Sequence, residues 1–146
     1  MYQRILVPVD GSSTSGHALQ EACKFARQLG AQLELVCVMG DIRLMNADSY
    51  INYAEMTEAL KSSGNRVLAQ AHAEARQAGI EAEVKLLEAG GDRIASVIVE
   101  EARNWQADLI VIGTHGRSGF SRVVFGSVAE GVVRTAPIPV LLLRGA

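Results

Sequence analysis

The sequence predicts a single α/β domain in which a parallel β-sheet is covered by helices. The chain has 146 residues, the length of one ordinary domain with a sizeable core. Short apolar runs alternate along it with amphipathic helical patterns, which is typical of βαβ units. One run, Leu109–Ile112, is apolar at every position, as a strand covered on both faces must be. Because no repeat, linker or low-complexity tract interrupts the pattern, we expect residues 1–146 to form one domain.

The first part of the chain predicts two strands joined by a helix. Residues 5–9 and 33–39 are the apolar runs expected to be strands. Between them, the hydroxyl side chains of residues 12–15 offer N-caps for a helix. Its apolar residues recur at helical spacing until Gly30, which is expected to end it. Residues 40–49 are polar and poorly patterned, which indicates a loop.

The rest of the chain continues the same alternation. A long helical pattern covers residues 50–78, and the segment Ser62–Asn65 within it is a candidate bend or break. Residues 81–86 alternate strictly between polar and apolar side chains, so this third strand is expected at an edge of the sheet. The remaining expected elements are a helix over residues 92–104, the strand over 109–112, a short helix over 127–135 and a last strand over 138–143.

Charge and hydropathy argue against nucleic-acid binding and membrane insertion. The formal net charge is -2, so no basic field is present to gather nucleic acid. No apolar run reaches the ~20 residues that span a bilayer. The apolar stretch near the N-terminus ends at Asp10, too early for the core of a signal peptide. We therefore expect a cytoplasmic protein.

The cysteines and histidines show no pattern of a redox or metal site. Cys23 and Cys37 lie within apolar patterns and form no C-x-x-C, so buried, reduced thiols are expected. The three histidines, His17, His72 and His115, lack the spacing of metal ligands. We expect no metal site built by the protein alone.

A glycine-rich segment after the central strand is the main candidate for chemistry. Gly113 and Gly116 follow that strand directly, and Gly126-Ser127 opens the next helix. In open α/β sheets, ligands bind beyond the carboxyl ends of the strands. Glycines let backbone N–H groups approach an anion, and a helix N-terminus favours negative charge. The segment therefore predicts an anion site, with two structural alternatives.

Both alternatives are ordinary backbone roles. Ser127 is followed three residues later by Glu130, so it fits a capping box and could serve only as a helix cap. Gly113 and Gly116 could serve only as a tight exit from the strand. Two familiar phosphate motifs are absent: the chain has no G-x-x-x-x-G-K-[ST], and its first strand is not followed by G-x-G-x-x-G.

Over essentially its whole length the chain resembles the universal stress protein family. The resemblance rests on the opening residues 5–12 (ILVPVDGS), on the spacing G-x2-G-x9-G-S from Gly113 to Ser127, and on the closing residues 137–142 (PIPVLL). The G-x2-G-x9-G-[ST] pattern marks the ATP-binding branch of that family. The resemblance implies a Rossmann-like fold of the adenine nucleotide alpha hydrolase type. This fold is an open five-stranded parallel sheet in the order 3-2-1-4-5, with helices on both faces.

The resemblance also implies a binding site for ATP, or for ADP or AMP, with Mg²⁺. Asp10 would meet the ribose hydroxyls or the adenine side, which suits a carboxylate acceptor that would repel phosphate. The backbone of Val38 would meet adenine. Pro8 and Val9 would line the pocket, and Ile112 and Gly113 would pass under the ribose. The residues that would hold the phosphates are Gly116, Gly126, Ser127 and Val128.

Four other polar residues within or near the glycine segment could also contact the ligand. Arg117 and Arg122 lie within the x9 stretch and could reach the outer phosphates, and we count Arg117 among the candidate binding residues. His115 could assist proton transfer, and Asp41 could help a divalent ion through water. For all four, a solvated loop residue is the alternative. Trp105 is expected to pack at a helix end.

Function is expected to lie in holding the nucleotide. A phosphoryl-transfer site needs metal-binding carboxylates beside the γ-phosphate, and the segment carries hydroxyls but no acidic cluster. We expect a regulatory ATP-binding protein; slow nucleotide hydrolysis or autophosphorylation is the enzymatic alternative, and a scaffold with an empty pocket is a third. The implied strand order leaves residues 140–143 on an edge, which pairing with a second copy would cover. We therefore expect a homodimer that engages a further protein partner.

Overall fold

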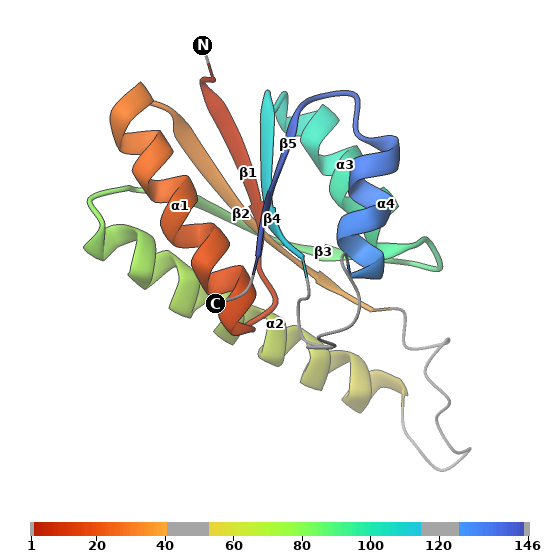
Figure 1. Ribbon diagram of the computed structural model, residues 1–146. Coiled ribbons are helices and arrows are strands. Elements are labelled where there is room, and N and C mark those ends of the chain that lie inside the picture. The colour runs from red at the N-terminus through yellow and green to blue at the C-terminus, as the bar shows by residue number, and fades with distance from the viewer. Residues whose placement is uncertain (1, 41–52, 115–125, 145–146) are drawn as a thin grey trace.

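A five-stranded parallel sheet with helices on both faces forms the molecule (Figure 1), in a computed structural model that describes residues 2–40, 53–114 and 126–144. The strands lie in the order β3-β2-β1-β4-β5, so the predicted fold class and strand order are confirmed. The strands are β1 (Arg4–Pro8), β2 (Gln32–Met39), β3 (Glu83–Glu88), β4 (Leu109–Gly113) and β5 (Val140–Leu143). The helices are α1 (Ser13–Leu29), α2 (Tyr53–Gln77), α3 (Ile94–Trp105) and α4 (Ser127–Thr135).

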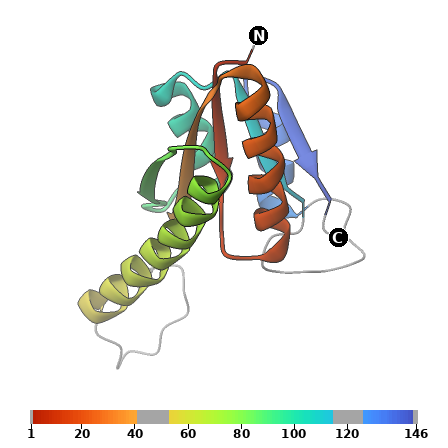
Figure 2. The same ribbon diagram turned by 90° about the vertical axis from the view of Figure 1, so that its left-hand side faces the viewer.

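The two faces of the sheet carry separate apolar layers. Ile5 and Val7 of β1 point into a layer beneath α1 and α2, whereas Leu6 between them points into a layer beneath α3 and α4. All three side chains are fully buried. Figures 1 and 2 show the two helix pairs on opposite faces, with the first turns of α2 extending beyond the sheet. Alternation along β1 thus makes this strand the common wall of both layers.

The strand order creates a switch point between β1 and β4. The chain leaves β1, crosses through α1 and returns to β2 on one side of β1, while β4 pairs with the other side. All neighbouring strands are parallel, so their carboxyl ends meet along one edge of the sheet. The connections that follow β1 and β4 diverge at this edge, which is where open α/β sheets form ligand sites.

Most predicted helix ends are confirmed. Ser12 caps α1, because its Oγ accepts a hydrogen bond from the Ser15 N–H at 3.1 Å. Gly30 ends the same helix in the left-handed region at φ 68°, where its N–H donates to the Ala26 carbonyl. Of the candidate bend or break at Ser62–Asn65, the break is wrong, because α2 runs without interruption from Tyr53 to Gln77.

The helix continues through residues 62–65 because it lies unusually close to the sheet there. A Cβ at Gly64 would lie 2.6 Å from Cδ1 of Leu86 on β3, so a side chain at this position would have to displace the end of the Leu86 side chain. The packing that this approach allows stabilises a helical glycine that intrinsic propensity disfavours.

The fold bears on the expected state of the cysteines and on the expectation of no membrane-spanning helix. Cys23 and Cys37 are buried and form no disulfide, as predicted, and burial raises the pKa of the Cys23 thiol. Within the three described stretches of chain, no helix combines the length and apolar character needed to cross a bilayer.

Trp105, the last residue of α3, packs at the helix end as predicted. Its side chain is 8% exposed and its Nε1 donates to Glu83 Oε2 on β3 at 3.3 Å. The Arg4 guanidinium lies 4.4 Å from the centroid of the ring, a cation–π distance, and Arg4 Nε donates to the Trp105 carbonyl. These contacts join the end of α3 to the amino-terminal ends of β1 and β3.

Beneath α3, the fold buries two carboxyl groups next to each other. Glu34 on β2 and Glu101 on α3 are each 4% exposed, and Lys85 Nζ lies 3.1 Å from Glu101 Oε1. Glu34 Oε1 has no hydrogen-bond partner among the described residues. Burial, together with the neighbouring Glu101, raises the pKa of Glu34 from 4.5 to about 8. Glu34 is therefore protonated at neutral pH, while Lys85 neutralises Glu101.

We expect Glu34→Gln to flatten the pH dependence of stability. In the unfolded chain Glu34 ionises near pH 4.5, but in the folded protein it holds its proton up to about pH 8. Unfolding therefore releases a proton in this window, and the free energy of unfolding of the wild type falls as pH rises, by up to about 1.4 kcal/mol per pH unit. Glutamine keeps the neutral shape without this loss. Urea unfolding at pH 6.5, 7.5 and 8.5 measures the effect.

The matched control is Glu130→Gln, which changes a carboxylate on α4 that is 53% exposed. This variant should keep the wild-type slope. Parallel pH profiles for Glu34→Gln and the wild type would show that Glu34 is already ionised at neutral pH.

Candidate functional site

A cavity of about 450 Å³ lies at the carboxyl edge of the sheet, at the switch point between β1 and β4. The ends of β1, β2 and β4 form its floor, α2 and α3 form its sides, and the first turn of α4 faces one end of it. Its volume is within the range of small-molecule sites. The lining residues are Pro8, Val9, Asp10, Ser15, residues 36–40, Leu60, Ser63, Gly64, Val67, Ile94, Ile98, residues 112–114 and residues 126–129.

The structure brings most of the predicted site residues to this one cavity. Those that line it are Pro8, Val9, Asp10, Val38, Ile112, Gly113, Gly126, Ser127 and Val128. They come from β1, β2, β4 and α4 and the turns beside them. The remaining candidates, Gly116, Arg117, Arg122, His115 and Asp41, lie outside the described residues. That the lining residues bind a nucleotide stays a prediction.

Asp10 is the one charged side chain among the described residues of the cavity wall. It follows the end of β1, where its Oδ1 accepts a hydrogen bond from the Ser12 N–H at 2.9 Å and its own N–H donates to Ser15 Oγ at 3.3 Å. Gly11 makes this turn possible at φ 85°. The turn holds the carboxylate in place, and within the described residues Oδ2 is left available to accept from a hydroxyl of a ligand.

Gly113 makes a close contact with α1 that the spacing of the glycines does not indicate. It is the last residue of β4, and a Cβ there would lie 2.5 Å from Thr14 Cγ2 and 3.0 Å from the Thr14 carbonyl oxygen. The end of β4 therefore touches the first turn of α1. Of the two predicted roles for this glycine, the structure supports a tight strand exit, and the same contact forms part of the floor of the cavity.

The N-cap of helix α4 is a glycine. Gly126 occupies this position and has no side chain with which to cap the helix. The capping-box interpretation of Ser127 is therefore wrong: Ser127 is the first helical residue and is exposed. Because Gly126, Ser127 and Val128 line the cavity, the N–H groups at the start of α4 are at its edge, where helix geometry favours an anion.

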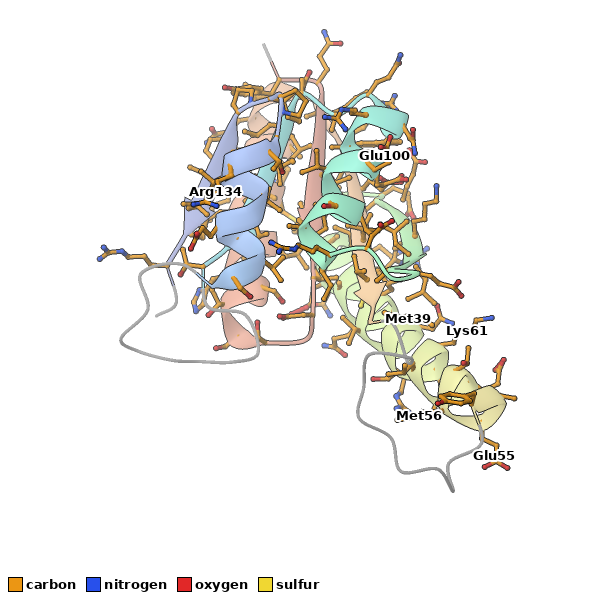
Figure 3. All side chains as sticks on the ribbon, turned by 90° about the vertical axis from the view of Figure 1, so that its right-hand side faces the viewer. Met39, Glu55, Met56, Lys61, Glu100 and Arg134 are labelled. Atoms are coloured by element: carbon orange, nitrogen blue, oxygen red, sulfur yellow. The ribbon has the colours of Figure 1, made fainter. Side chains whose placement is uncertain are left out.

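Helix α2 supplies a wall that sequence patterns did not assign. Leu60, Ser63, Gly64 and Val67 lie on one side of it and line the cavity. The one signal in the sequence is the Ser62–Asn65 interruption, which by itself indicates a break in the helix. Figure 3 shows Met39 at the end of the sheet toward which the first turns of α2 extend, whereas Glu100 and Arg134 lie on the outer surfaces of α3 and α4.

The lining offers two kinds of contact. Val38, Met39, Leu60 and Ile94 contribute apolar side chains, while Ser127 lies where the backbone donors of α4 begin. A flat apolar ring with an attached anionic group matches both kinds of contact, and Asp10 offers an acceptor for hydroxyl groups.

A second hollow of about 620 Å³ adjoins this cavity between α1 and α2. It shares Val9, Ser15 and Val67 with the first. The remainder of its lining comes from these two helices and from the turn before α1, and it includes His17 and Arg66. None of its described lining residues belongs to the carboxyl end of β2 or β4, so the geometry of the switch point favours the first cavity as the site.

Comparison with known sequences identifies relatives along the full chain. The model of the universal stress protein family matches residues 1–144. A universal stress protein of Methanocaldococcus jannaschii is 32% identical over 144 residues, which cover 99% of this chain and 83% of the relative.

Comparison with solved structures gives the same result. A protein of the universal stress protein family from Burkholderia pseudomallei superposes with a TM-score of 0.80 at 33% identity, over 99% of this chain and 97% of that one. The universal stress protein of Archaeoglobus fulgidus in complex with dAMP gives a TM-score of 0.70 at 28% identity, over 97% and 98% of the two chains.

We expect Gly113→Ala to lower the free energy of unfolding by about 1–3 kcal/mol, because the new methyl group overlaps the backbone of Thr14. Gly16→Ala within α1 is the matched control. No atom lies within 4 Å of its added Cβ, so helix propensity should raise stability by about 0.5–1 kcal/mol. Urea unfolding compares both with the wild type. An unchanged midpoint for Gly113→Ala would mean that β4 and α1 are not in tight contact in solution.

Proposed function

The chain belongs to the universal stress protein family, and we propose that it holds an adenine nucleotide in the cavity at the switch point, as a regulatory protein acting through a homodimer. One observation carries the proposal. The candidate residues that the structure describes lie far apart in the sequence, yet they line a single cavity with the N-terminus of α4 at its edge.

In the proposed orientation, adenosine lies over the ends of β1 and β2. The apolar side chains near Val38 cover the adenine ring, and Asp10 accepts from the ribose hydroxyls. The phosphates lie at the start of α4, where Gly126 lines the cavity and Ser127 and Val128 present N–H donors. This orientation keeps the Asp10 carboxylate away from the phosphates, which it would repel.

Similarity to a nucleotide-bound relative supports this ligand class. The Archaeoglobus fulgidus protein of the same family was solved in complex with dAMP, and the two chains match over nearly their full lengths. An adenine nucleotide is therefore the ligand that we propose here. ATP with Mg²⁺ is the specific ligand within this class, and ADP and AMP are its alternatives. Within the described residues, no three His, Cys, Asp or Glu side chains are grouped to hold a metal. Phosphate oxygens and water would accordingly supply most ligands of the Mg²⁺ ion.

We propose that the protein holds the nucleotide and turns it over slowly, if at all. Phosphoryl transfer needs carboxylates that place a metal ion beside the γ-phosphate. The charged residue of the described wall, Asp10, lies at the adenosine end in this orientation. Slow hydrolysis or autophosphorylation is the alternative activity.

The proposed homodimer forms through β5. This strand ends the sheet, and all four of its residues are half-buried. The carbonyl of Pro139 accepts a hydrogen bond from the N–H of Ile110 in β4, and the carbonyl of Leu143 accepts one from the N–H of Thr114, directly after β4. Because backbone groups alternate along a strand, those of Val140 and Leu142 point away from β4 to the open edge. A second copy related by a two-fold axis can pair with this edge.

We expect Ser127→Asp to abolish the advantage of AMP over adenosine. A carboxylate at the first position of α4 interacts favourably with the helix, so the fold should be retained. It repels a phosphate at the same place, and we expect the affinity for AMP to fall at least tenfold with adenosine affinity unchanged. Isothermal titration calorimetry with AMP and adenosine measures both.

Ser127→Asn is the matched control, since it has a similar shape without charge and should keep AMP binding within a few-fold of the wild type. If Ser127→Asp binds AMP as the wild type does, the phosphates do not lie at α4. If the wild type binds no adenine nucleotide below millimolar concentration, the proposed function is wrong.

We expect Val140→Pro to weaken the dimer about tenfold, because each copy loses one N–H at the open edge while the bonds to β4 remain. Proline is tolerated at the first residue of a strand. Light scattering on a dilution series should give twice the chain mass of 15.6 kDa for the wild type and for Val140→Thr, which keeps the N–H. A monomeric wild type at micromolar concentration would refute pairing through β5.

A further inference from the structure

Thr114 carries a hydroxyl that is buried in the cavity wall without a partner. The residue is 3% exposed and lines the cavity directly after β4. Its Oγ1 has an accessible area below 1 Å² and makes no hydrogen bond with any described residue. Buried hydroxyl groups nearly always have a partner, because leaving one unpaired in the folded state is unfavourable. Because water cannot reach Oγ1 in this rotamer, a ligand in the cavity supplies the missing bond once rotation about χ1 turns the hydroxyl toward the cavity.

The backbone of Thr114 is held on both sides. Its N–H donates to the Leu143 carbonyl of β5 at 2.9 Å, and its carbonyl accepts from the Gly126 N–H at the start of α4. The residue thus joins the ends of β4 and β5 to the N-cap of α4. These bonds occupy both backbone groups, so the hydroxyl is the polar group that Thr114 can offer to a ligand.

The neighbours of this hydroxyl indicate which ligand atom it meets. Through its bond to Gly126, Thr114 lies beside the first turn of α4, whose N–H groups favour an anion. A ligand atom that satisfies those donors is an acceptor, so the hydroxyl of Thr114 must donate to it. The preceding residue, Gly113, is where the proposed ribose lies. A phosphate oxygen close to the ribose fits both neighbours.

We propose that the Thr114 hydroxyl donates a hydrogen bond to the phosphate nearest the ribose, and that this bond makes the site prefer a nucleotide over its nucleoside. The inference rests on the proposed adenine-nucleotide function and adds a residue that selects the ligand class. It assigns a binding role to Thr114 in addition to those proposed for Gly126 and Ser127.

The burial of Thr114 makes its contribution larger than that of Ser127. The Ser127 side chain lies on an exposed residue, so its hydroxyl exchanges bonds with water for bonds with phosphate. Oγ1 of Thr114 is shielded from water before the ligand arrives, and it has no such bonds to lose. A hydrogen bond from this hydroxyl to a charged phosphate oxygen therefore adds to the binding free energy without the loss of a bond to water. Removal of the hydroxyl should lower the affinity by about tenfold or more.

The test compares Thr114→Val and Thr114→Ser with the wild type. Valine keeps the shape and removes the unpaired hydroxyl, so the ligand-free protein should melt about 3 °C higher. The dissociation constant for AMP should rise tenfold or more, while that for adenosine stays within twofold. Serine keeps the hydroxyl and should restore AMP affinity. Thermal melts without ligand and calorimetric titrations with AMP and with adenosine give the three readouts.

Three results would overturn the inference. The first is unchanged AMP affinity in Thr114→Val, and the second is an equal loss for AMP and adenosine; both leave the proposed function intact. The third is a lower melting temperature for ligand-free Thr114→Val, which would show that the hydroxyl has a structural partner. If Thr114→Val does not fold, Thr114→Ala replaces it in the titrations, with the same expected loss for AMP alone. A wild type that binds neither ligand overturns the proposed function itself, and this inference with it.

Discussion

The contact between Gly113 and the first turn of α1 is the constraint on which the cavity depends. The end of β4 lies so close to Thr14 that no side chain fits between them. This approach sets the separation between the end of β4 and the first turn of α1. Thr114 comes next, and its backbone bonds to Leu143 and Gly126 carry the same placement to β5 and to the start of α4. The floor of the cavity and its anion-favouring end are thus parts of one connected arrangement.

The opposite side of the cavity depends on a second close approach. At Gly64, α2 comes near enough to β3 that Leu86 occupies the space of a side chain. Ser63 and Val67 are thereby brought into the wall, beside the ends of β1 and β2. Two glycines on different elements therefore permit close approaches beside the cavity, Gly113 between β4 and α1 and Gly64 between α2 and β3. Neither has a positive φ, so what each contributes is space and not an unusual backbone conformation.

The buried carboxyl groups near α3 lie away from the cavity. Glu34 and Glu101 lie beneath this helix toward the amino-terminal ends of the strands, whereas Ile94 and Ile98 of the same helix line the cavity at the carboxyl ends. Burial of a carboxyl group disfavours its charged form, which is why Glu34 stays protonated. Helix α3 is thus in contact with a titrating group at one end and with the proposed ligand at the other.

Local patterns in the sequence were enough to predict the fold class, the edge position of β3, the caps of α1 and the start of α4, because periodicity and capping are interactions between near neighbours in the chain. The family resemblance added the strand order and nine of the residues that line the cavity. The packing of the elements in space was needed to show that Ser127 is not a cap and that Ser63 and Gly64 line the cavity. It was also needed to show that Gly113 has no room for a side chain and that the Thr114 hydroxyl has no partner among the described residues. Each of these depends on the distance between elements far apart in sequence, which side-chain packing sets and no local pattern records.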